Sequence, residues 1–308
     1  MPENRHAYLI IAHNNFNQLK LLLELLDDSR NDIFLHIGKD VHNVDLSQFT
    51  SICKSSPLYL ANKRMIGYWG GKSLVDITLL LLKQVLETSD YAYYHLLSGV
   101  DLPIKTQDYI HDFFEKNNGK EFVGFDPAYL TDKEYRENTI SRVRYHHLFT
   151  YLYLLRKYGG LLSRGSGFIH TYLDGASVII QRLFGVDRIS KLNLEIYKGA
   201  QWFSITQNFA KYLVGKQLQI EKLVKHSFCA DEIFVQTIIM NSPFQESLSS
   251  NTTEGTMRHI DWKRGGPYTF RYADLDELMQ SDKLFARKFD ERVDMKIIEE
   301  IYNRLKRR

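Results

Sequence analysis

The sequence has few of the residues that staple extracellular domains or anchor a chain in a membrane. Its 308 residues include two cysteines, Cys53 and Cys229, and neither has a CxxC partner. This argues against a disulfide framework or a zinc site and fits a reducing compartment. The longest apolar run, residues 74–82, is too short to span a bilayer, and the first residues lack the apolar core of a secretion signal. We therefore expect a cytoplasmic protein.

The chain also lacks a strong excess of charge. Its formal net charge is +3, which gives no general sign of nucleic-acid binding, so we expect no nucleic-acid partner. The C-terminus is basic, with Arg304, Lys306, Arg307 and Arg308. Such an end can touch an anionic membrane surface, although a solvated helix end is the simpler interpretation. A peripheral contact of this C-terminus with the inner face of the plasma membrane is a secondary expectation.

Several catalytic motifs are absent. The sequence contains no GxGxxG, GxxxxGK[ST], GxSxG or HExxH. No Asp-x-Asp follows an apolar strand, where two carboxylates could hold a divalent ion. The nearest pair, Asp274 and Asp276, lies in a helical segment. These motifs therefore indicate no metal or other cofactor site in the sequence. If the substrate is a nucleotide diphosphate, cationic side chains must take the place of the metal.

The first 125 residues alternate between strand and helix patterns. Residues 7–12 are continuously apolar, as in a buried parallel strand. This order predicts an α/β layered sheet, in which ligands bind beyond the carboxyl ends of the strands. His13, His36 and Asp101 lie at or just past such ends. We expect strands at 7–12, 33–37, 91–97 and 122–124 and helices at 17–26, 73–87 and 107–115.

The rest of the chain divides into an irregular and a regular part. Residues 126–198 have weak periodicity, and the glycines in 159–160 and 164–167 are expected to break the chain. We predict loops and helices that cover the sheet or, alternatively, a lid over a substrate. No linker is visible, so we expect one domain. In residues 199–308 we expect strands at 201–206 and 257–260 and helices at 231–240, 274–280 and 294–304.

Two adjacent cations, Arg287 and Lys288, stand between Phe285 and Phe289. Arginine offers a bidentate fork and lysine a point charge, a suitable pair for a diphosphate. The alternative is that the aromatic residues are core anchors and the cations pair with nearby aspartates. Arg264 adds a cation on a glycine-rich loop, where a simple turn is the alternative interpretation.

Two acidic residues, Asp231 and Glu232, begin a helical pattern. Acidic residues in a first turn commonly complement the helix dipole. The functional interpretation is a general base that takes a proton from a hydroxyl group.

Trp69 and two glycines precede the apolar helix pattern at 73–87, with Arg64 just upstream. Glycines let a ligand approach the backbone, and a helix N-terminus favours anions. A tight turn explains the same residues. His13 and His36 could bond a base or ribose, although a lone histidine at a strand end is more often structural.

Taken together, these segments resemble the core-2/I-branching β-1,6-N-acetylglucosaminyltransferases and peptide O-xylosyltransferases, in a shorter bacterial form. The similarity runs from Ala7 to about Ile301. It is carried by Ala-Tyr-Leu-Ile-Ile-Ala-His (7–13), His-Ile (36–37), Trp-Gly-Gly (69–71), Leu-Leu-Ser-Gly-Val-Asp-Leu-Pro-Ile (96–104), Gly-Ala-Gln-Trp-Phe (199–203), Asp-Glu (231–232) and Phe-Ala-Arg-Lys-Phe (285–289).

The resemblance implies a GT-A-type, Rossmann-like mixed sheet flanked by helices, with a loop-rich or helical middle insertion and no metal requirement. It implies a nucleotide-binding half (1–125), a variable lid or acceptor region (126–198) and a catalytic, diphosphate-binding half (199–308). The implied site residues are Glu232 as catalytic base; Arg287, Lys288 and Arg264 for the diphosphate; His13, His36, Arg64, Trp69 and Asp101 for the nucleotide; and Gln201, Trp202 and Asp231 for the sugar or acceptor pocket.

The implied activity is inverting transfer of a sugar from a UDP-sugar, first of all UDP-N-acetylglucosamine, to a glycan or lipid-linked glycan in surface polysaccharide synthesis. The alternatives are UDP-xylose, UDP-glucose or UDP-galactose as donor, or a non-catalytic glycan- or nucleotide-binding relative. The chain departs from the family pattern at Gly38, where relatives usually have Asp, and at Gln201, where some have Asp. Residues 126–198 match poorly.

Overall fold

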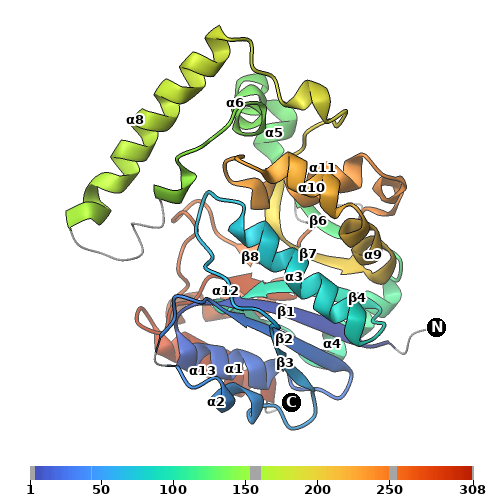
Figure 1. The fold of residues 1–308 in the computed structure, drawn as a ribbon. Coiled ribbons are helices and arrows are strands. Elements are labelled where there is room, and N and C mark those ends of the chain that lie inside the picture. Colours follow the sequence, from blue (N-terminus) through green and yellow to red (C-terminus); the bar gives the residue numbers. More distant parts are fainter. Residues whose placement is uncertain (1–3, 43, 153–160, 250–254, 307–308) are drawn as a thin grey trace.

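A six-stranded mixed sheet forms the centre of the protein (Figure 1). The computed structural model describes residues 4–42, 44–152, 161–249 and 255–306. The strand order is β3-β2-β1-β4-β7-β6; the first four strands are parallel, and β7 and β6 are antiparallel to their neighbours. This confirms the expected mixed α/β sheet. The strands are β1 (His6–Ala12), β2 (Asn31–Ile37), β3 (Leu58–Leu60), β4 (Tyr93–Ser98), β6 (Phe122–Phe125) and β7 (Gly199–Thr206).

The central strand β1 shows why the sheet is covered on both faces. Its side chains alternate, so Ala7 and Leu9 belong to one buried cluster and Tyr8 and Ile10 to the other. Burial of each large apolar side chain contributes about 1.5–3 kcal/mol, which favours a strand with no solvent-facing side. The continuous apolar run therefore correctly predicted a buried parallel strand.

Helices supply the other half of each cluster. On the side of Ala7 and Leu9 lie α3 (Ser73–Thr88), α9 (Gln207–Gly215), α10 (Gln217–Val224) and α11 (Phe234–Met240). On the side of Tyr8 and Ile10 lie α1 (Phe16–Leu26), α2 (Ser47–Thr50), α4 (Gln107–Lys116), α12 (Leu275–Gln280) and α13 (Met295–Lys306).

A second, three-stranded sheet joins the two halves of the chain. It has the order β5-β9-β8, with β5 at Asp101–Pro103, β9 at Phe285–Arg287 and β8 at Arg258–Ile260. Asp101 pairs with Arg287 across the antiparallel β5–β9 ladder. We expected a strand at 257–260 but none at 285–287, because three residues are too few to show a period.

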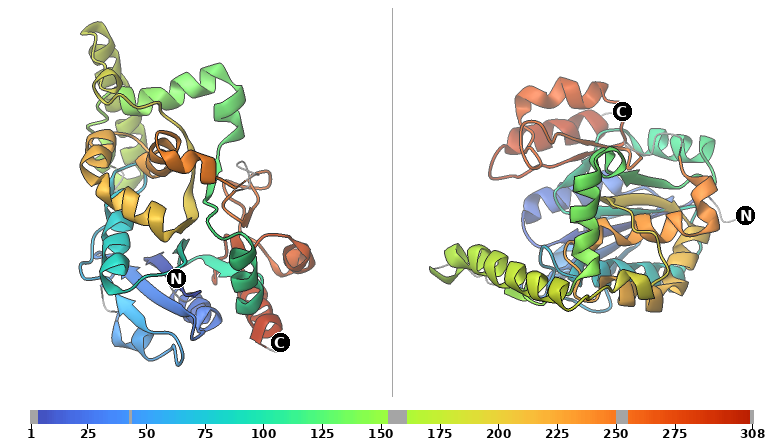
Figure 2. Two further views of the ribbon diagram at one scale, coloured as in Figure 1. Left: turned by 90° about the vertical axis from the view of Figure 1, so that its right-hand side faces the viewer. Right: turned by 90° about the horizontal axis from the view of Figure 1, so that it is seen from above.

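The middle region forms helices above the sheet: α5 (Pro127–Thr131), α6 (Lys133–Arg144) and α8 (Leu161–Leu183). Helix α8 projects from the body in both Figure 1 and Figure 2. The prediction of a break at 164–167 was wrong, because α8 continues through Gly165 and Gly167. Gly159 and Gly160 lie outside the described residues. A second correction concerns Asp231 and Glu232, which form a 3-10 turn (Ala230–Glu232) before α11 instead of starting that helix.

Gly199, the first residue of β7, has no room for a side chain. A Cβ there would lie 1.8 Å from the carbonyl oxygen of Gly124 and 2.9 Å from Nε2 of Gln236. That amide donates to the carbonyls of both Gly124 and Ala200, so it cannot move away cheaply. We expect Gly199→Ala to lower the free energy of unfolding by about 1–3 kcal/mol, measured by urea denaturation. Gly215→Ala is the control, since a Cβ there meets nothing within 4 Å. Equal losses in the two variants would contradict the packing argument.

Candidate active site

A large cleft, of about 1800 Å³, opens at the carboxyl edge of the parallel strands. His13, Gly38 and Ser98, at or after the ends of β1, β2 and β4, line one part of it, in agreement with the rule for α/β sheets. The second half of the chain supplies the rest of the lining. Eight of the twelve residues predicted for the site line this cleft: His13, His36, Trp69, Gln201, Trp202, Asp231, Glu232 and Arg287.

Glu232 is a half-buried carboxylate held between two cations. Its Oε2 lies 3.7 Å from Nη1 of Arg142 and 3.7 Å from Nζ of Lys198. Lys198 is itself fixed by the Asp126 carboxylate at 2.6 Å and the Tyr135 hydroxyl at 2.8 Å. The cations orient the carboxylate from the side without burying it. A carboxylate that stays accessible in a cleft can take a proton from a hydroxyl group.

Asp231 differs from its neighbour in environment. It is buried, and desolvation, followed by the nearby charge of Glu232, raises the pKa of Asp231 to about 7. Burial disfavours the charged form of an acid, and a like charge adds to this. Glu232 is the more accessible of the two carboxylates, which makes it the better placed to take a proton from a ligand in the cleft.

Arg287 lines the cleft, and one nitrogen of its guanidinium is hydrogen-bonded to the protein. Its Nη1 donates to Oδ1 of Asp101 at 2.8 Å and to Oγ of Ser98 at 2.5 Å. The guanidinium also lies over the ring of Trp202, with Cζ 4.5 Å from the centroid. These contacts fix a cation at the cleft wall before any ligand binds.

Asp101 does not line the cleft, contrary to the idea that it contacts a nucleotide. It is fully buried and accepts bonds from the Ser98 backbone and hydroxyl as well as from Arg287. Its geometry is that of an anchor for Arg287.

Arg258 is a cation that the sequence did not single out. It lines the cleft, is nearly fully buried and donates to the carbonyls of Leu96 and Thr256. Burial lowers the pKa of Arg258 to about 10, and the charge of Asp101 counters this effect. At neutral pH it stays protonated. Arg258 and Arg287 together carry one more charge than Asp101 neutralises, so this wall of the cleft is positive.

Arg264 does not line the cleft either. Its guanidinium is ion-paired with Asp261, with Asp274 at 2.6 Å and with Glu277 at 3.2 Å, and it stacks on Tyr268. Three carboxylates more than offset its charge. The structure therefore places Arg264 in an ion-pair network beside the cleft, and its contact with a diphosphate stays a prediction.

Arg64 and Lys288 complete the four predicted residues that are not at the cleft surface. The Arg64 guanidinium donates to the carbonyls of Ile37, Gly38 and Val41, which holds the loop after β2. The backbone of Lys288 bonds Tyr268 and Phe270. Both residues shape loops beside the cleft.

Two exposed tryptophans stand at the cleft. Trp69 packs edge-on against Phe228, with ring centroids 5.3 Å apart. Trp262, which the sequence analysis did not select, lies on the loop after β8 and is 65% exposed. Large aromatic faces in a cleft are suited to stacking on rings.

The residue at 38 is glycine, yet a carboxylate occupies the space beside it. Oδ1 of Asp40 lies 2.7 Å from the position that a Cβ of residue 38 would take. Asp40 thus fills the volume that an aspartate at 38 would need. Close by, Nε2 of the buried His36 accepts a bond from the Met65 backbone at 2.9 Å, which orients its ring.

Two further observations concern only the described ranges of the chain. Within them, no group of three or more His, Cys, Asp or Glu residues is arranged to hold a metal ion. Nor does any helix there have the length and apolar character needed to cross a membrane.

Comparison with known proteins now identifies the family. The family model described as Core-2/I-Branching enzyme matches residues 6–281. The chain belongs to this family of glycosyltransferases. This confirms the resemblance found in the sequence and agrees with a GT-A-like fold for the mixed sheet.

The curated relatives are larger proteins. Xylosyltransferase 2 of Rattus norvegicus is 25% identical over 97% of this chain, which corresponds to 33% of the relative. Xylosyltransferase 2 of Homo sapiens shows the same values. Xylosyltransferase 1 of Homo sapiens is 22% identical over 97% of the chain and 30% of the relative. The chain thus spans about a third of the length of these proteins.

Proposed function

We propose that this protein is an inverting glycosyltransferase that moves a sugar from a UDP-sugar to a hydroxyl group of a glycan or lipid-linked glycan. The observation that carries the proposal is that Glu232 and the cation Arg287 line the same cleft. One offers a base for the acceptor and the other a counter-charge for a leaving diphosphate. Membership of the core-2/I-branching family supports the same reading.

In the proposed reaction, Glu232 takes the proton of the acceptor hydroxyl. The hydroxyl oxygen then attacks the anomeric carbon as the bond to the diphosphate breaks, so configuration inverts. Negative charge develops on the diphosphate. Arg287 is fixed by Asp101 and therefore needs no reorganisation to stabilise this charge, and Arg258 adds to the positive potential. We propose that these cations make a divalent metal unnecessary.

Two observations bear on the donor sugar. The sequence resemblance put UDP-N-acetylglucosamine first, whereas the names of the curated relatives favour UDP-xylose. We therefore propose one of these two as the donor. UDP-glucose and UDP-galactose remain the alternatives within the same fold.

We also keep a cytoplasmic location and a role in surface polysaccharide synthesis as parts of the proposal. A peripheral membrane contact of the basic C-terminus remains a secondary part of the proposal. Of its residues, Arg304 is ion-paired with Glu300 and with Asp276, each at 3.3 Å, so the charge of Arg304 is already balanced.

The first prediction concerns the base. Glu232→Gln removes the proton acceptor but keeps the size of the side chain, so turnover should fall by about 10²–10⁴-fold while UDP affinity changes little. UDP release and calorimetric titration with UDP measure the two effects. Glu246→Gln, on an exposed turn outside the cleft, is the matched control. Near-normal turnover of Glu232→Gln would rule out the assigned base.

The second prediction separates two arginines. Arg287→Gln should weaken UDP binding by roughly 10–100-fold, the value of a hydrogen bond to a charged group. Arg264→Gln should change it by less than about twofold, because Arg264 serves three carboxylates outside the cleft. Arg287→Lys, which keeps the charge beside Asp101, controls for misfolding. Equal losses of UDP affinity in Arg264→Gln and Arg287→Gln would refute the role of Arg287 at the diphosphate. A wild-type enzyme that is inactive in excess EDTA and regains activity with manganese would refute the proposal that cations replace a metal.

The third prediction concerns the donor. Release of UDP from UDP-N-acetylglucosamine, UDP-xylose, UDP-glucose and UDP-galactose is compared in the presence of glycan acceptors. One of the first two donors should react at least about tenfold faster than the others, since small pocket differences are worth one to two powers of ten. UDP binding without turnover of any donor would instead favour a non-catalytic relative.

A further inference from the structure

Helix α8 packs on the protein with its polar side and turns its apolar side outward. Its single acidic residue, Asp174, is buried and bonded to Nδ1 of His147 at 2.5 Å. Gln181 bonds the backbone of His146 through both ends of its amide. An amphipathic helix in a soluble body normally buries the opposite side. The orientation of α8 therefore calls for a second environment on its outer face.

The outer face is a continuous apolar stripe. All its members are exposed, and its large side chains range from 43% for Leu173 to 82% for Phe184 just after the helix. They recur at spacings of three and four residues, so at about 100° per residue they fall within one side of the helix. The stripe consists of Ile169, Leu173, Ala176, Ile179, Ile180, Leu183 and Phe184. Since Asp174 points to the body, this side presents no carboxylate from α8.

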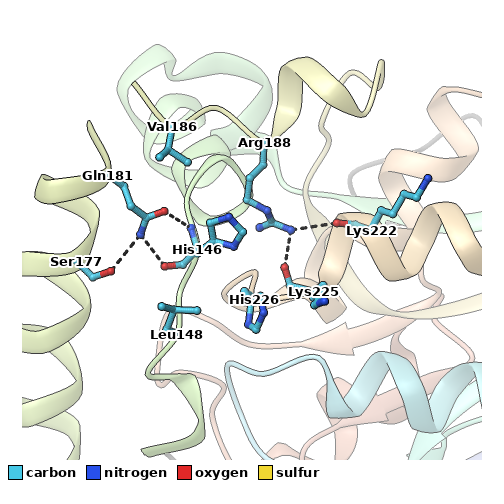
Figure 3. A pocket seen from close by; sticks show the side chains of 9 residues that line it. All are labelled: His146, Leu148, Ser177, Gln181, Val186, Arg188, Lys222, Lys225 and His226. Carbon is cyan, nitrogen blue, oxygen red and sulfur yellow. Dashed lines mark hydrogen bonds between the residues drawn. The ribbon is translucent and has the colours of Figure 1, made fainter. Parts of the chain in front are cut away.

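A cationic hollow of about 620 Å³ lies along the flank of the same helix (Figure 3). Ser177 and Gln181 form its α8 side, and no acidic residue is among the described residues that line it. Its lining includes Arg188, Lys222 and Lys225 at the end of α10, and the two histidines His146 and His226. The backbone carbonyl of Lys222 faces Arg188, whereas its ammonium group points away from the hollow (Figure 3).

Among the described residues, no carboxylate is ion-paired with Arg188, and backbone carbonyls hold its charge in place. Its guanidinium donates to four backbone carbonyls, those of Val143, Tyr145, Lys222 and Lys225. Burial, together with the charges of Arg188 and Lys225, lowers the pKa of both His146 and His226. The hollow is thus a positive environment suited to anions.

The apolar stripe and the cationic hollow are placed as expected for an amphipathic helix that lies in the plane of a membrane interface. Ser177 lies about a quarter of a turn, and Gln181 about a third of a turn, round the helix from the middle of the apolar stripe. If the stripe enters the acyl boundary, the flank lies at the depth of the headgroups, which is where the hollow opens. The C-terminus and α13 lie at the far end of the molecule from α8 (Figure 1).

We propose that α8 and the adjacent cationic hollow form a docking surface for a bilayer that contains anionic phospholipid. The apolar stripe inserts between lipids, while Arg188, Lys222 and Lys225 attract the headgroups. The proposal does not depend on the transferase activity, which is tested separately.

The test is flotation of the full chain with vesicles of phosphatidylcholine, alone or mixed with phosphatidylglycerol. Wild type should bind the mixed vesicles at least about tenfold more strongly than the neutral ones, because each lysine near an anionic surface is worth about fivefold. Ile180→Asp with Leu183→Asp, and separately Lys222→Gln with Lys225→Gln, should each lower binding to mixed vesicles by about tenfold or more. All four side chains are exposed, so the fold should persist, as thermal melting checks.

The control is Val293→Asp, an exposed apolar position just before α13, which should bind like wild type. No binding to mixed vesicles, or equal loss in the control, would overturn the proposal. A second result would also overturn it. If the wild type sediments as a dimer and binds no vesicles, and Ile180→Asp with Leu183→Asp converts it to a monomer, then a second copy of the chain covers the stripe.

Discussion

The ion pair between Asp101 and Arg287 is the interaction on which the site depends. It joins β5 to β9 at paired positions, although the two residues are 186 positions apart in the sequence. Asp101 is completely buried, so loss of either partner would leave a charge without compensation in the interior. A buried carboxylate held by two bonds from Ser98 gives the guanidinium one position. Arg287 is thus fixed at the cleft because the buried Asp101 needs its positive charge, and this pair also links β5 to β9 in the small sheet.

The same pair explains which parts of the fold the sequence could predict. The strands of the large sheet were visible because each is a run of buried apolar residues, and α3 and α1 were visible from their helical spacing. Strand β9 was not, since Phe285–Arg287 is three residues long and its partner lies far away in the sequence. Sequence patterns indicate structure that neighbouring residues form together, whereas a three-residue strand such as β9 is stabilised mainly by the strands it pairs with.

For the site, the sequence predicted residue types better than their surroundings. Arg264 and Arg258 look alike in the sequence, yet Arg264 is surrounded by three carboxylates and Arg258 is buried at the cleft. The difference depends on Asp261, Asp274 and Glu277, which gather only when the loop after β8 meets α12. The carboxylate missing at residue 38 is a similar case, because Asp40 fills that space through the turn of the loop.

Helix α8 shows what periodicity leaves open. Its apolar spacing defines a stripe but does not say whether the stripe faces the protein. Two glycines, each costing about 1 kcal/mol in a helix, made a break at 164–167 the natural prediction. The helix is instead tied to the body by polar contacts of Asp174 and Gln181. These bonds fix the apolar side outward at the cost of exposing large hydrophobic side chains to water. Because such exposure lowers the stability of the free protein, it is best understood as a surface shaped for something other than water.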